Sequence, residues 1–481
     1  MYDVAIIGCG VIGAACAYEL SHYDQSVVIL EAKNDVAAGT TKANSAILHA
    51  GYDPAPDTWM GKLNVRGVRL ARDICQRLDV GYKQCGSLVV AFSEADLPTL
   101  EALYQRGLAN GVPGIELVDA ARAHELEPEL SDAVVGALWA PTAAIVNPWE
   151  FALAMAEVAV RNGAELRLRA QVTAATRTSA GTFELTVPQG IVSARTVINA
   201  AGVAAGQVHN LIATPSFHIT PTRGQYHLLD HSSAGIVRHV VFQCPNERGK
   251  GVLVAPTVHG NVIVGPDAEP LPDDQADNTA CTAAGQDFVA QQALLSIPKL
   301  NLRDNIRNFA GIRANVDSGD FIIGEAPDVP GWFDLAGMKS PGLSCAPAVA
   351  EVASDWLADC GIRGAKKQDY QDGRTHIRFV EHTPDERARL VAQDPAYGRI
   401  ICRCETVTEA EIIQALHEEI PATTIDGVKR RAGTGMGRCQ GGFCGPRILE
   451  LICRELGMSP LEVLQDEDGS YVLDSLAKGG E

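Results

Sequence analysis

The sequence predicts an α/β protein, and three observations lead to this fold class. Residues 4–7 (VAII) and 26–30 (SVVIL) are short apolar runs typical of buried strands. The segment Val11–Leu20 between them has the composition of a helix, and the glycine-rich run Gly8–Gly13 joins it to the first strand, as in a Rossmann-like βαβ unit. Strand-like runs broken by proline and glycine over 209–310 indicate an α+β domain, and a small helical domain ends the chain.

Length and charge limit the class of protein. At 481 residues the chain is too long for one compact core, so two or three domains are expected. The formal net charge of −19 argues against a nucleic-acid-binding protein, although a local arginine can still hold an anionic substrate. No signal peptide precedes the first strand, and no apolar run is long enough for a membrane-spanning helix. We therefore expect a cytoplasmic protein with no integral membrane segment, associated with a membrane at most through a partner.

The other elements follow from hydrophobic periodicity. Helices are expected at 63–78, 94–110, 150–163 and 346–356, and strands at 86–93, 166–172, 182–187, 196–199 and in the runs QYHLL, GVLVAP, NVIVGP, FIIGEAP and WFDLAGM. A charged, weakly periodic stretch over 361–397 is expected to be a linker between a domain at 1–360 and one at 398–481. Within 1–360, nucleotide-binding segments are expected at about 1–80, 145–208 and 311–360, and a substrate part at about 81–144 and 209–310.

The run Gly8-Cys9-Gly10-Val11-Ile12-Gly13 has the context that makes a GxGxxG pattern meaningful, because it follows a strand and opens a helix. Gly8 permits the tight turn, Gly10 lets the backbone approach a pyrophosphate, and Gly13 lets helix and strand pack closely. The phosphates would lie at the helix N-terminus, where free N–H groups favour an anion. Glu31, which ends the second strand, can accept hydrogen bonds from an adenosine ribose.

Two later segments help to choose between NAD and FAD, which share this fingerprint. Residues 196–206 (TVINAAGVAAG) and 333–343 (FDLAGMKSPGL) are strands that run into small residues, where backbone can approach a flat ring system. Together with the loop after Glu31 (GTTKANSAILHAGYDP), they resemble the glycine oxidase and glycerol-3-phosphate dehydrogenase family of FAD oxidoreductases, in the family's order along 1–360. The resemblance implies that the cofactor is FAD.

The resemblance also implies which residues lie along the FAD. They come from the glycine-rich run, the loop after the second strand, the end of the strand-like run 166–172, the AAG turn and the late glycine segment. The expected FAD-binding residues are Gly8, Gly10, Val11, Ile12, Gly13, Glu31, Thr40, Thr41, Asn44, Ser45, His49, Val172, Ala200, Ala201, Gly202, Gly337, Lys339, Gly342 and Leu343. Lys339 could place positive charge near the flavin N1–C2 edge.

The candidate substrate residues follow from the chemistry of a small anionic alcohol. Arg313, in AGIRANVD, is expected to bind a carboxylate or phosphate, as the resemblance implies for an arginine in a Gly-x-Arg segment. His49 and His259 are the candidate bases, since the alcohol must lose its hydroxyl proton as it is oxidised. A structural role stays open for each histidine. The strand-like segment PTRGQYHLL adds three candidate polar contacts, from Arg223, Gln225 and Tyr226.

The cysteines indicate a metal centre near the C-terminus. The chain has thirteen cysteines, most of them scattered singly as in a reducing compartment, but Cys402, Cys404, Cys439 and Cys444 form two close pairs. Four thiolates suit a [2Fe–2S] cluster or a structural zinc ion. The segments ICRCETVTEAEI and VKRRAGTGMGRCQGGFCGPR resemble the bacterioferritin-associated-ferredoxin-like domain, which implies [2Fe–2S]. Lys429, Arg430, Arg431 and Arg438 would offset the negative charge of the cluster.

These features predict a dehydrogenase that oxidises a small anionic alcohol and passes electrons to a partner protein. The two-part architecture resembles anaerobic glycerol-3-phosphate dehydrogenases, so glycerol 3-phosphate is the leading substrate. The segments NSAILHAGYD and PTRGQY resemble L-2-hydroxyglutarate dehydrogenases, so a 2-hydroxy acid is the alternative, followed by an amino acid. A hypothesis of another class is an electron-transfer and docking subunit with no working substrate pocket.

Overall fold

The computed structural model describes residues 1–245 and 251–475, and it divides the chain into two units. The large unit contains residues 1–32 and 36–373. The C-terminal unit contains residues 374–481 together with Lys33–Asp35, a short segment from the loop after the second strand. Positions 476–481 of the expected C-terminal domain lie outside the described residues.

The core of the large unit is a parallel sheet, as the glycine-rich βαβ pattern predicts. Its strands run in the order β20 (Trp332–Ala336), β12 (Gly190–Asn199), β1 (Tyr2–Ile7), β2 (Val27–Leu30) and β9 (Glu165–Arg167), and every neighbouring pair is parallel. Antiparallel strands extend this sheet: β10 (Ala174–Arg177), β11 (Phe183–Val187) and β19 (Ile322–Glu325). The central strands β1 and β2 are apolar and almost wholly buried, as expected for a sheet covered on both faces.

Helix α1 (Val11–Ser21) packs against strands β1 and β2 of this sheet. It is buried nearly all round and contacts α5 (Pro148–Arg161) and α8 (Gly342–Asp359). Helix α2 (Trp59–Arg77) packs against α8, where the missing side chain of Gly67 lets the two backbones approach. The observed helices agree with the predicted positions to within a few residues, because each carries the apolar face or cap that the sequence shows.

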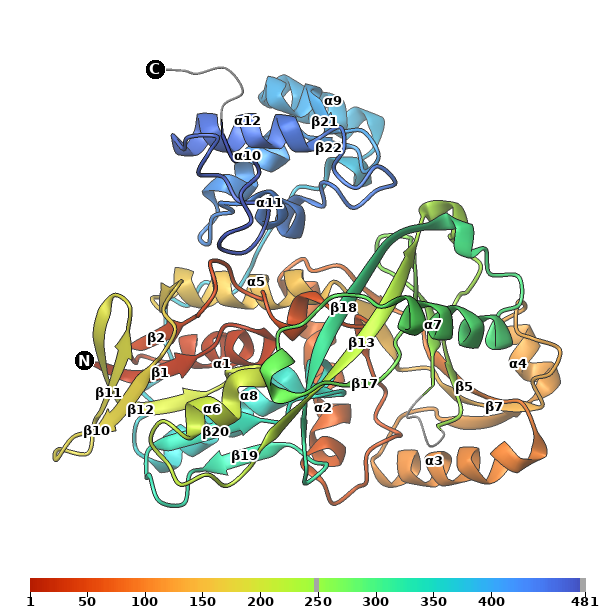
Figure 1. Ribbon diagram of the computed structural model, residues 1–481, viewed down its shortest axis with the longest axis horizontal. Helices are drawn as coiled ribbons and strands as arrows, with labels where there is room; N and C mark the ends of the chain where they lie inside the picture. The colour runs from red at the N-terminus through yellow and green to blue at the C-terminus, as the bar shows by residue number, and fades with distance from the viewer. Residues whose placement is uncertain (246–250, 476–481) are drawn as a thin grey trace. The chain divides into compact units, whose positions relative to one another are not determined.

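A second, mostly antiparallel sheet forms the α+β part of the large unit (Figure 1). Its longest pair is β13 (Ile219–Leu229) with β18 (Asn305–Val316), which are antiparallel along almost their whole length. The other strands of this sheet are β5 (Ser87–Ala91), β6 (Glu116–Asp119), β7 (Gly136–Ala140), β14 (Val240–Gln243), β15 (Leu253–Pro256), β16 (Val262–Gly265) and β17 (Glu269–Pro270). Helices α3 (Leu97–Ala109), α4 (Ala120–Leu126) and α7 (Ala283–Ser296) contact it, and a small sheet joins β3 (Ile47–Leu48), β4 (Tyr82–Gln84) and β8 (Ala144–Val146).

The C-terminal unit is small and mainly helical, as predicted. Helices α10 (Glu409–His417), α11 (Ile425–Ala432) and α12 (Gly445–Leu456) enclose an apolar core, and β21 (Ile400–Cys402) pairs with β22 (Val407–Thr408). Thr408 caps α10, and Glu411 completes a capping box that fixes the start of this helix. The fold class predicted from the sequence is confirmed in both units.

Two local features differ from the predictions. The strand expected at 166–172 ends at Arg167, because Arg169 adopts a left-handed φ of 52° and Ala170 bonds to the Glu31 carbonyl instead of a neighbouring strand. The stretch 361–397, expected as a linker, contains helix α9 (Pro384–Gln393), which begins at a capping box formed by Thr383 and Glu386. Among the described helices, none combines the length and apolar character needed to cross a membrane.

Candidate functional site

Four predicted cofactor segments meet because four neighbouring parallel strands end at one edge of the sheet. Ile7 of β1 pairs with Leu30 of β2 and Asn199 of β12, and Asn199 pairs with Asp334 of β20. The residues that follow these strands are Gly8, Glu31, Ala200 with Gly202, and Gly337. Crevices outside the carboxyl ends of parallel strands are the usual ligand sites of open α/β sheets. The topology therefore gathers segments that are up to about 330 residues apart in the chain.

The glycine-rich turn leaves no room for side chains. Gly8 has a φ of +96°, and a Cβ there would lie 2.6 Å from the Ala200 carbonyl oxygen. A Cβ on Gly13 would lie 1.9 Å from the Gly8 carbonyl oxygen, which no side chain can tolerate. The two glycines thus bring α1, the turn and the AAG segment into backbone contact, which is the close approach that a pyrophosphate site needs.

Polar side chains at this edge bond to the backbone of the glycine-rich turn. The Cys9 N–H donates to a carboxylate oxygen of the buried Glu31 at 2.7 Å, and the Val11 N–H donates to the Thr41 hydroxyl at 3.0 Å. Gly10 precedes α1 without a side-chain cap. The Glu31 carboxylate just after β2 and the N-terminus of α1 therefore lie on the two sides of one turn, as the sequence pattern predicts for the ribose and phosphate ends of a dinucleotide.

The loop after β2 crosses the end of β18. The Thr40 hydroxyl donates to the Ile312 carbonyl at 2.6 Å, and a Cβ on Gly311 would lie 1.8 Å from the Ala43 carbonyl oxygen. Asn44 braces the loop through bonds to the carbonyls of Thr40 and Thr41. Ser45 reaches the Tyr226 hydroxyl of β13 at 3.2 Å, so the loop joins the nucleotide edge to the second sheet.

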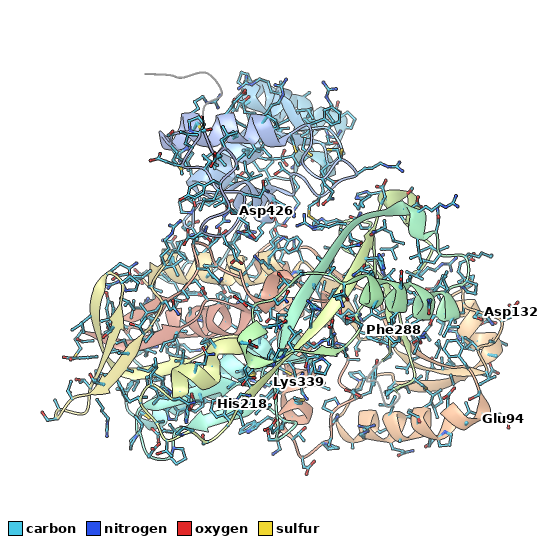
Figure 2. The ribbon with its side chains drawn as sticks, in the orientation of Figure 1. Glu94, Asp132, His218, Phe288, Lys339 and Asp426 are labelled. Atoms are coloured by element: carbon cyan, nitrogen blue, oxygen red, sulfur yellow. The ribbon has the colours of Figure 1, made fainter. Side chains whose placement is uncertain are left out.

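The remaining expected FAD-binding residues lie at the same strand ends. Gly202 and Gly337 adopt left-handed φ values of 60° and 67°, which permit sharp turns after β12 and β20. Lys339, labelled in Figure 2, lies in the turn after β20, where its N–H bonds to the Gly337 carbonyl at 2.7 Å. The other residues are Ala201 beside Gly202, Gly342 and Leu343 in the first turn of α8, and the buried Val172 after β9.

The predicted substrate residues lie on opposite faces of the β13–β18 pair. Side chains alternate along a strand, and directly paired residues share a face. Thr222, Gly224 and Tyr226 pair with Arg313, Gly311 and Phe309, so all six lie on the face that the Thr40–Ser45 loop crosses.

Arg223 and Gln225 lie on the opposite face and are engaged there. Arg223 is 4% exposed, bonded to Glu269 at 2.7 Å and to the Ala280 carbonyl at 2.6 Å. The fully buried Gln225 bonds to Asp267 and to Thr282. The structure therefore brings Tyr226 and Arg313 together and leaves Arg223 and Gln225 on the far side of the sheet, since an odd step along a strand reverses the face.

Arg313 is held in place by its neighbours. A Cβ on Gly224 would lie 2.4 Å from a terminal nitrogen of the guanidinium, so the glycine makes room for the side chain. The same nitrogen donates to the Asp267 carbonyl at 2.9 Å. Burial raises the pKa of the Asp267 carboxyl, whose oxygens accept bonds from Gln225. Gly224 and Asp267 were not among the predicted residues, although Gly224 lies between two of them in the sequence.

The two candidate histidines lie in different surroundings. His49 Nε2 lies 3.1 Å from the Ser340 hydroxyl, and the ring stacks on Phe242. The backbone N–H of His49 donates to the Ser344 hydroxyl at 2.8 Å. His49 thus contacts the glycine segment that follows β20. His259 Nε2 lies 3.2 Å from the side-chain amide of Asn147, the residue that caps α5. Sequence reasoning did not find Ser340 or Ser344, which have no motif of their own.

The four paired cysteines gather at one end of the C-terminal unit. Cys404 and Cys439 have their sulfurs 3.7 Å apart, and the Cys402 and Cys444 thiols are hydrogen bonded. The bond from Cys444 and several backbone N–H groups lower the pKa of Cys402 to about 6, while the bond to Cys402 and burial raise that of Cys444. Soft thiolate donors in this number fit an iron–sulfur cluster. The described residues contain no group of three or more potential ligands already spaced for a single metal ion, so the full ligand set stays a proposal.

The basic residues beside the cysteines do not all act as predicted. Arg430 and Arg431 are buried, and both form ion pairs with Asp35 at 2.9 Å, while Arg430 also pairs with Asp466. Burial alone would raise the pKa of Asp35, but Arg431 and Arg430 lower it to about 2. The expectation that these two arginines offset cluster charge is therefore corrected, because internal carboxylates already neutralise them.

Comparison with known proteins agrees with both halves of this description. Residues 3–356 match the family of FAD dependent oxidoreductases (DAO), and residues 400–454 match the BFD-like [2Fe-2S] binding domain. The chain is 45% identical to a glycerol 3-phosphate dehydrogenase of Caloramator mitchellensis over 479 residues, 99% of each chain. It is 30% identical to an L-2-hydroxyglutarate dehydrogenase of Escherichia coli O17:K52:H18 over 273 residues, 56% of this chain and 64% of that protein.

A solved structure shows the same fold with its cofactor. The dithionite-reduced L-alpha-glycerophosphate oxidase from Mycoplasma pneumoniae with FAD bound superposes with a TM-score of 0.73 at 30% identity, over 78% of this chain and 98% of that one. The fold and the glycine-lined strand edge thus define an FAD-binding oxidoreductase. The chain belongs to the family of FAD dependent oxidoreductases and carries a C-terminal BFD-like [2Fe–2S]-binding domain. The predicted cofactors, FAD and a [2Fe–2S] cluster, are confirmed at this level.

Proposed function

We propose that this protein oxidises sn-glycerol 3-phosphate to dihydroxyacetone phosphate and passes the electrons to a partner protein. The observation that carries the proposal is the 45% identity to a glycerol 3-phosphate dehydrogenase along 99% of both chains. A relative similar only in the FAD-binding part would say nothing about the function of the cysteine domain. The similarity to this dehydrogenase includes both units of the chain.

The substrate phosphate would bind to Arg313. This side chain is half-buried and lies on the face of β13–β18 that the Thr40–Ser45 loop crosses. One terminal nitrogen already donates to the Asp267 carbonyl, so the guanidinium is oriented before a ligand arrives. A fixed guanidinium gives paired, charge-assisted hydrogen bonds to a phosphate, and little side-chain entropy is lost on binding.

His49 is the candidate base of the reaction. Its ring is fixed by the Phe242 stack and by the Ser340 hydroxyl at Nε2, close to the glycine segment of the cofactor edge. A neutral imidazole can accept the hydroxyl proton of the substrate at the ring nitrogen that is not bonded to Ser340, while the Ser340 bond at Nε2 holds the ring orientation. His259 would act as a structural residue that holds the start of α5 through Asn147.

The strand-end residues would hold the FAD, with Glu31 at the ribose and the N-terminus of α1 at the pyrophosphate. When bound, FAD supplies the acceptor for the two electrons that leave the substrate carbon. The cysteines Cys402, Cys404, Cys439 and Cys444 would hold the [2Fe–2S] cluster, which carries single electrons. A one-electron centre suits transfer to a partner protein.

L-2-Hydroxyglutarate is the second candidate substrate, supported by the similarity to enzymes that carry that name. It has two carboxylates, so it needs a second anion-binding group besides Arg313. The nearest arginine of the same segment, Arg223, is committed to Glu269 on the opposite face of the sheet. The geometry therefore favours the phosphate, which one guanidinium can hold.

The test is an anaerobic titration of the holoenzyme with each substrate, followed by the visible absorbance of the flavin. We expect sn-glycerol 3-phosphate to bleach the flavin and L-2-hydroxyglutarate to leave it oxidised. Bleaching by L-2-hydroxyglutarate alone would identify that compound as the substrate and exclude sn-glycerol 3-phosphate. If neither compound reduced the flavin while the protein still bound a redox partner, it would be an electron-transfer and docking subunit instead.

Arg313→Ala should lower kcat/KM for glycerol 3-phosphate by about a hundredfold to a thousandfold, because a charge-assisted pair to the phosphate is lost. Arg313→Lys should recover part of this loss, since the charge returns without the planar fork. The matched control is Arg122→Ala, an exposed arginine on α4 paired with Glu125, which should leave the rate unchanged. An Arg313→Ala enzyme with the parent kcat/KM would refute the assignment.

A further inference from the structure

One turn of the C-terminal unit presents an aromatic ring to solvent between two of the paired cysteines. Phe443 is 81% exposed, whereas Cys444 beside it is buried. Gly441 has a φ of +87°, and a Cβ there would meet nothing within 4 Å, so space is open on this side of the turn, while Gly435 lies near the Gly441 backbone. An exposed phenylalanine costs solvation free energy unless a partner covers it at some stage.

The turn that carries Phe443 is braced. The Gln440 side-chain amide donates to the carbonyls of Met436 and Gly437, each at 3.0 Å, and the Phe443 N–H bonds to the Cys439 sulfur. The backbone of Phe443 is thus joined by one hydrogen bond to a sulfur of the proposed cluster site. A pre-organised aromatic side chain of this kind is typical of the centre of a protein–protein interface.

Three exposed arginines lie near the paired cysteines in the chain. Arg403 and Arg438 each directly precede a cysteine, and those two cysteines, Cys404 and Cys439, have their sulfurs 3.7 Å apart. Arg447 lies in the first turn of α12, three residues after Cys444. The nearby Glu405 is half-buried and packs against Gly437. In a chain with a net charge of −19, this basic cluster is a local exception.

We propose that the Phe443 face, defined by Arg403, Arg438, Phe443 and Arg447, is the docking surface for an acidic one-electron carrier protein. This inference rests on the proposed electron transfer to a partner and names the chemistry of that partner. Acidic groups on the carrier would pair with the three arginines, and an apolar contact would cover the Phe443 ring. The cysteines would hold the cluster as the one-electron donor, so each encounter would reduce one oxidised carrier by one electron without a change in covalent bonds.

The arginines and the ring have separate roles. Exposed charges steer association and make its rate fall with ionic strength, because salt screens them. A buried aromatic ring mainly slows dissociation. The remainder of this acidic protein would repel an acidic carrier, so the arginines would also select where the carrier binds.

The experiment uses the oxidised holoenzyme and plastocyanin, an acidic one-electron protein, with basic cytochrome c for comparison. Binding is measured at low and high salt, and stopped-flow spectroscopy follows electron transfer from enzyme reduced with dithionite. Chemical reduction makes the result independent of the substrate, so a failure of the proposed substrate and a failure of this surface are distinguishable. Iron content and visible absorbance of each variant report whether the cluster is intact.

We expect Phe443→Ala to weaken plastocyanin binding about tenfold and Arg447→Glu to weaken it about threefold to tenfold at low salt, with normal iron content. The matched control is Arg389→Glu, an exposed arginine on α9 of the same unit, which should bind like the parent. Because Arg447 lies outside the turn between the cysteines, its variant tests the surface even where Phe443→Ala loses iron.

Three results would overturn the proposal. The variants could bind plastocyanin as the parent does, or cytochrome c could bind as tightly and with the same losses. The third result is that the parent forms a salt-dependent dimer and that Arg447→Glu converts it to a monomer. A second copy of the chain would then be the partner that binds to this face.

Discussion

The nucleotide edge of the large unit and the cysteine end of the C-terminal unit serve redox groups in different ways. At the nucleotide edge, Gly8 and Gly13 lack side chains, so backbone segments pack in direct contact, and the N–H groups of Cys9 and Val11 bond to Glu31 and Thr41. At the cysteine end, four cysteine side chains lie close together, and we propose that their sulfurs hold the cluster. One site is made by backbone in close contact, and the other by side-chain chemistry on short turns.

The difference determines how each site tolerates change. A backbone site fails when volume is added, since a new Cβ meets a carbonyl oxygen that cannot move. A side-chain site fails when a single donor atom changes, even if the volume stays the same. A substitution can therefore disrupt one site while the other unit stays intact.

The first prediction concerns one methyl group added at the nucleotide edge. Gly13→Ala places a Cβ 1.9 Å from the Gly8 carbonyl oxygen, so the turn must shift. Overpacking of about 1–3 kcal/mol would weaken FAD affinity about tenfold to a hundredfold. Flavin retained per chain after gel filtration measures it. Gly324→Ala, on β19 of the same sheet with open space around it, is the control; if both variants kept FAD equally, the backbone model of this edge would be wrong.

The second prediction concerns the donor atoms of the cysteine end. Cys402→Ser keeps the volume but replaces a thiolate by a poor iron ligand, so the protein should lose most of its iron. Reduction of the bound flavin by glycerol 3-phosphate should persist, because the nucleotide edge is untouched. Cys453→Ser, a half-buried cysteine of the same unit that has no pair, should keep its iron. Full iron content in the Cys402→Ser protein would remove this cysteine from the ligand set.

The third prediction separates buried charge from cluster charge. Asp35→Asn removes the partner of two buried arginines, which should destabilise the C-terminal unit by about 3–5 kcal/mol. Heating the holoenzyme reports this as earlier loss of cluster absorbance, while flavin fluorescence follows the large unit. Asp474→Asn, an exposed aspartate of the same unit, is the control. Equal transitions in both variants would show that the ion cluster adds nothing to stability.

The same ion cluster gives a direction for pH dependence. The pKa of Asp35 is lowered to about 2, so its stabilising charge is complete above the ordinary aspartate value of about 4. That contribution is lost as the pH falls from about 4 towards about 2, through the folded-state value. The difference in unfolding temperature between the parent and Asp35→Asn should therefore shrink over this range. A constant difference would contradict the assignment.

The smallest effect is expected at the support of His49. Ser340→Ala removes one hydrogen bond of 3.1 Å to Nε2, worth about 1 kcal/mol, so kcat should fall about threefold to tenfold with little change in KM. The pH at which kcat is half-maximal should also move, because the hydroxyl no longer favours one protonation state of the ring. Ser318→Ala, at an exposed serine, serves as the comparison. An unchanged pH profile would leave Ser340 with a structural role only.

The strength of sequence reasoning differed between local and long-range features. The βαβ unit and the cysteine pairs are encoded by residues close together in the chain, so spacing alone was enough to predict them. The family match then confirmed FAD and [2Fe–2S] as the cofactors. Spacing could not show which face of β13 lies toward the cofactor edge. That face is the one crossed by the loop from Thr40 to Ser45, which comes from a distant part of the chain.

Arg430 and Arg431 illustrate the same limit in the C-terminal unit. In sequence they lie beside the cysteines, which suggested charge compensation, but their partner Asp35 lies almost 400 residues away. Gly224 illustrates it in the large unit, since its role is to leave space for an arginine on a different strand. Long-range pairs of this kind leave no periodic or spacing signal.

By itself, the sequence determined that the protein has a Rossmann-like βαβ unit, a nucleotide site built on glycine and a four-cysteine tail, because each depends on neighbours in the chain. Only the tertiary structure decided that Arg313 and Tyr226 share a face while Arg223 and Gln225 do not, and that Asp35 neutralises two arginines. The physical reason is that strand register and buried ion pairing are set by contacts between distant segments. Such contacts exist only once the sheet and the helices have packed.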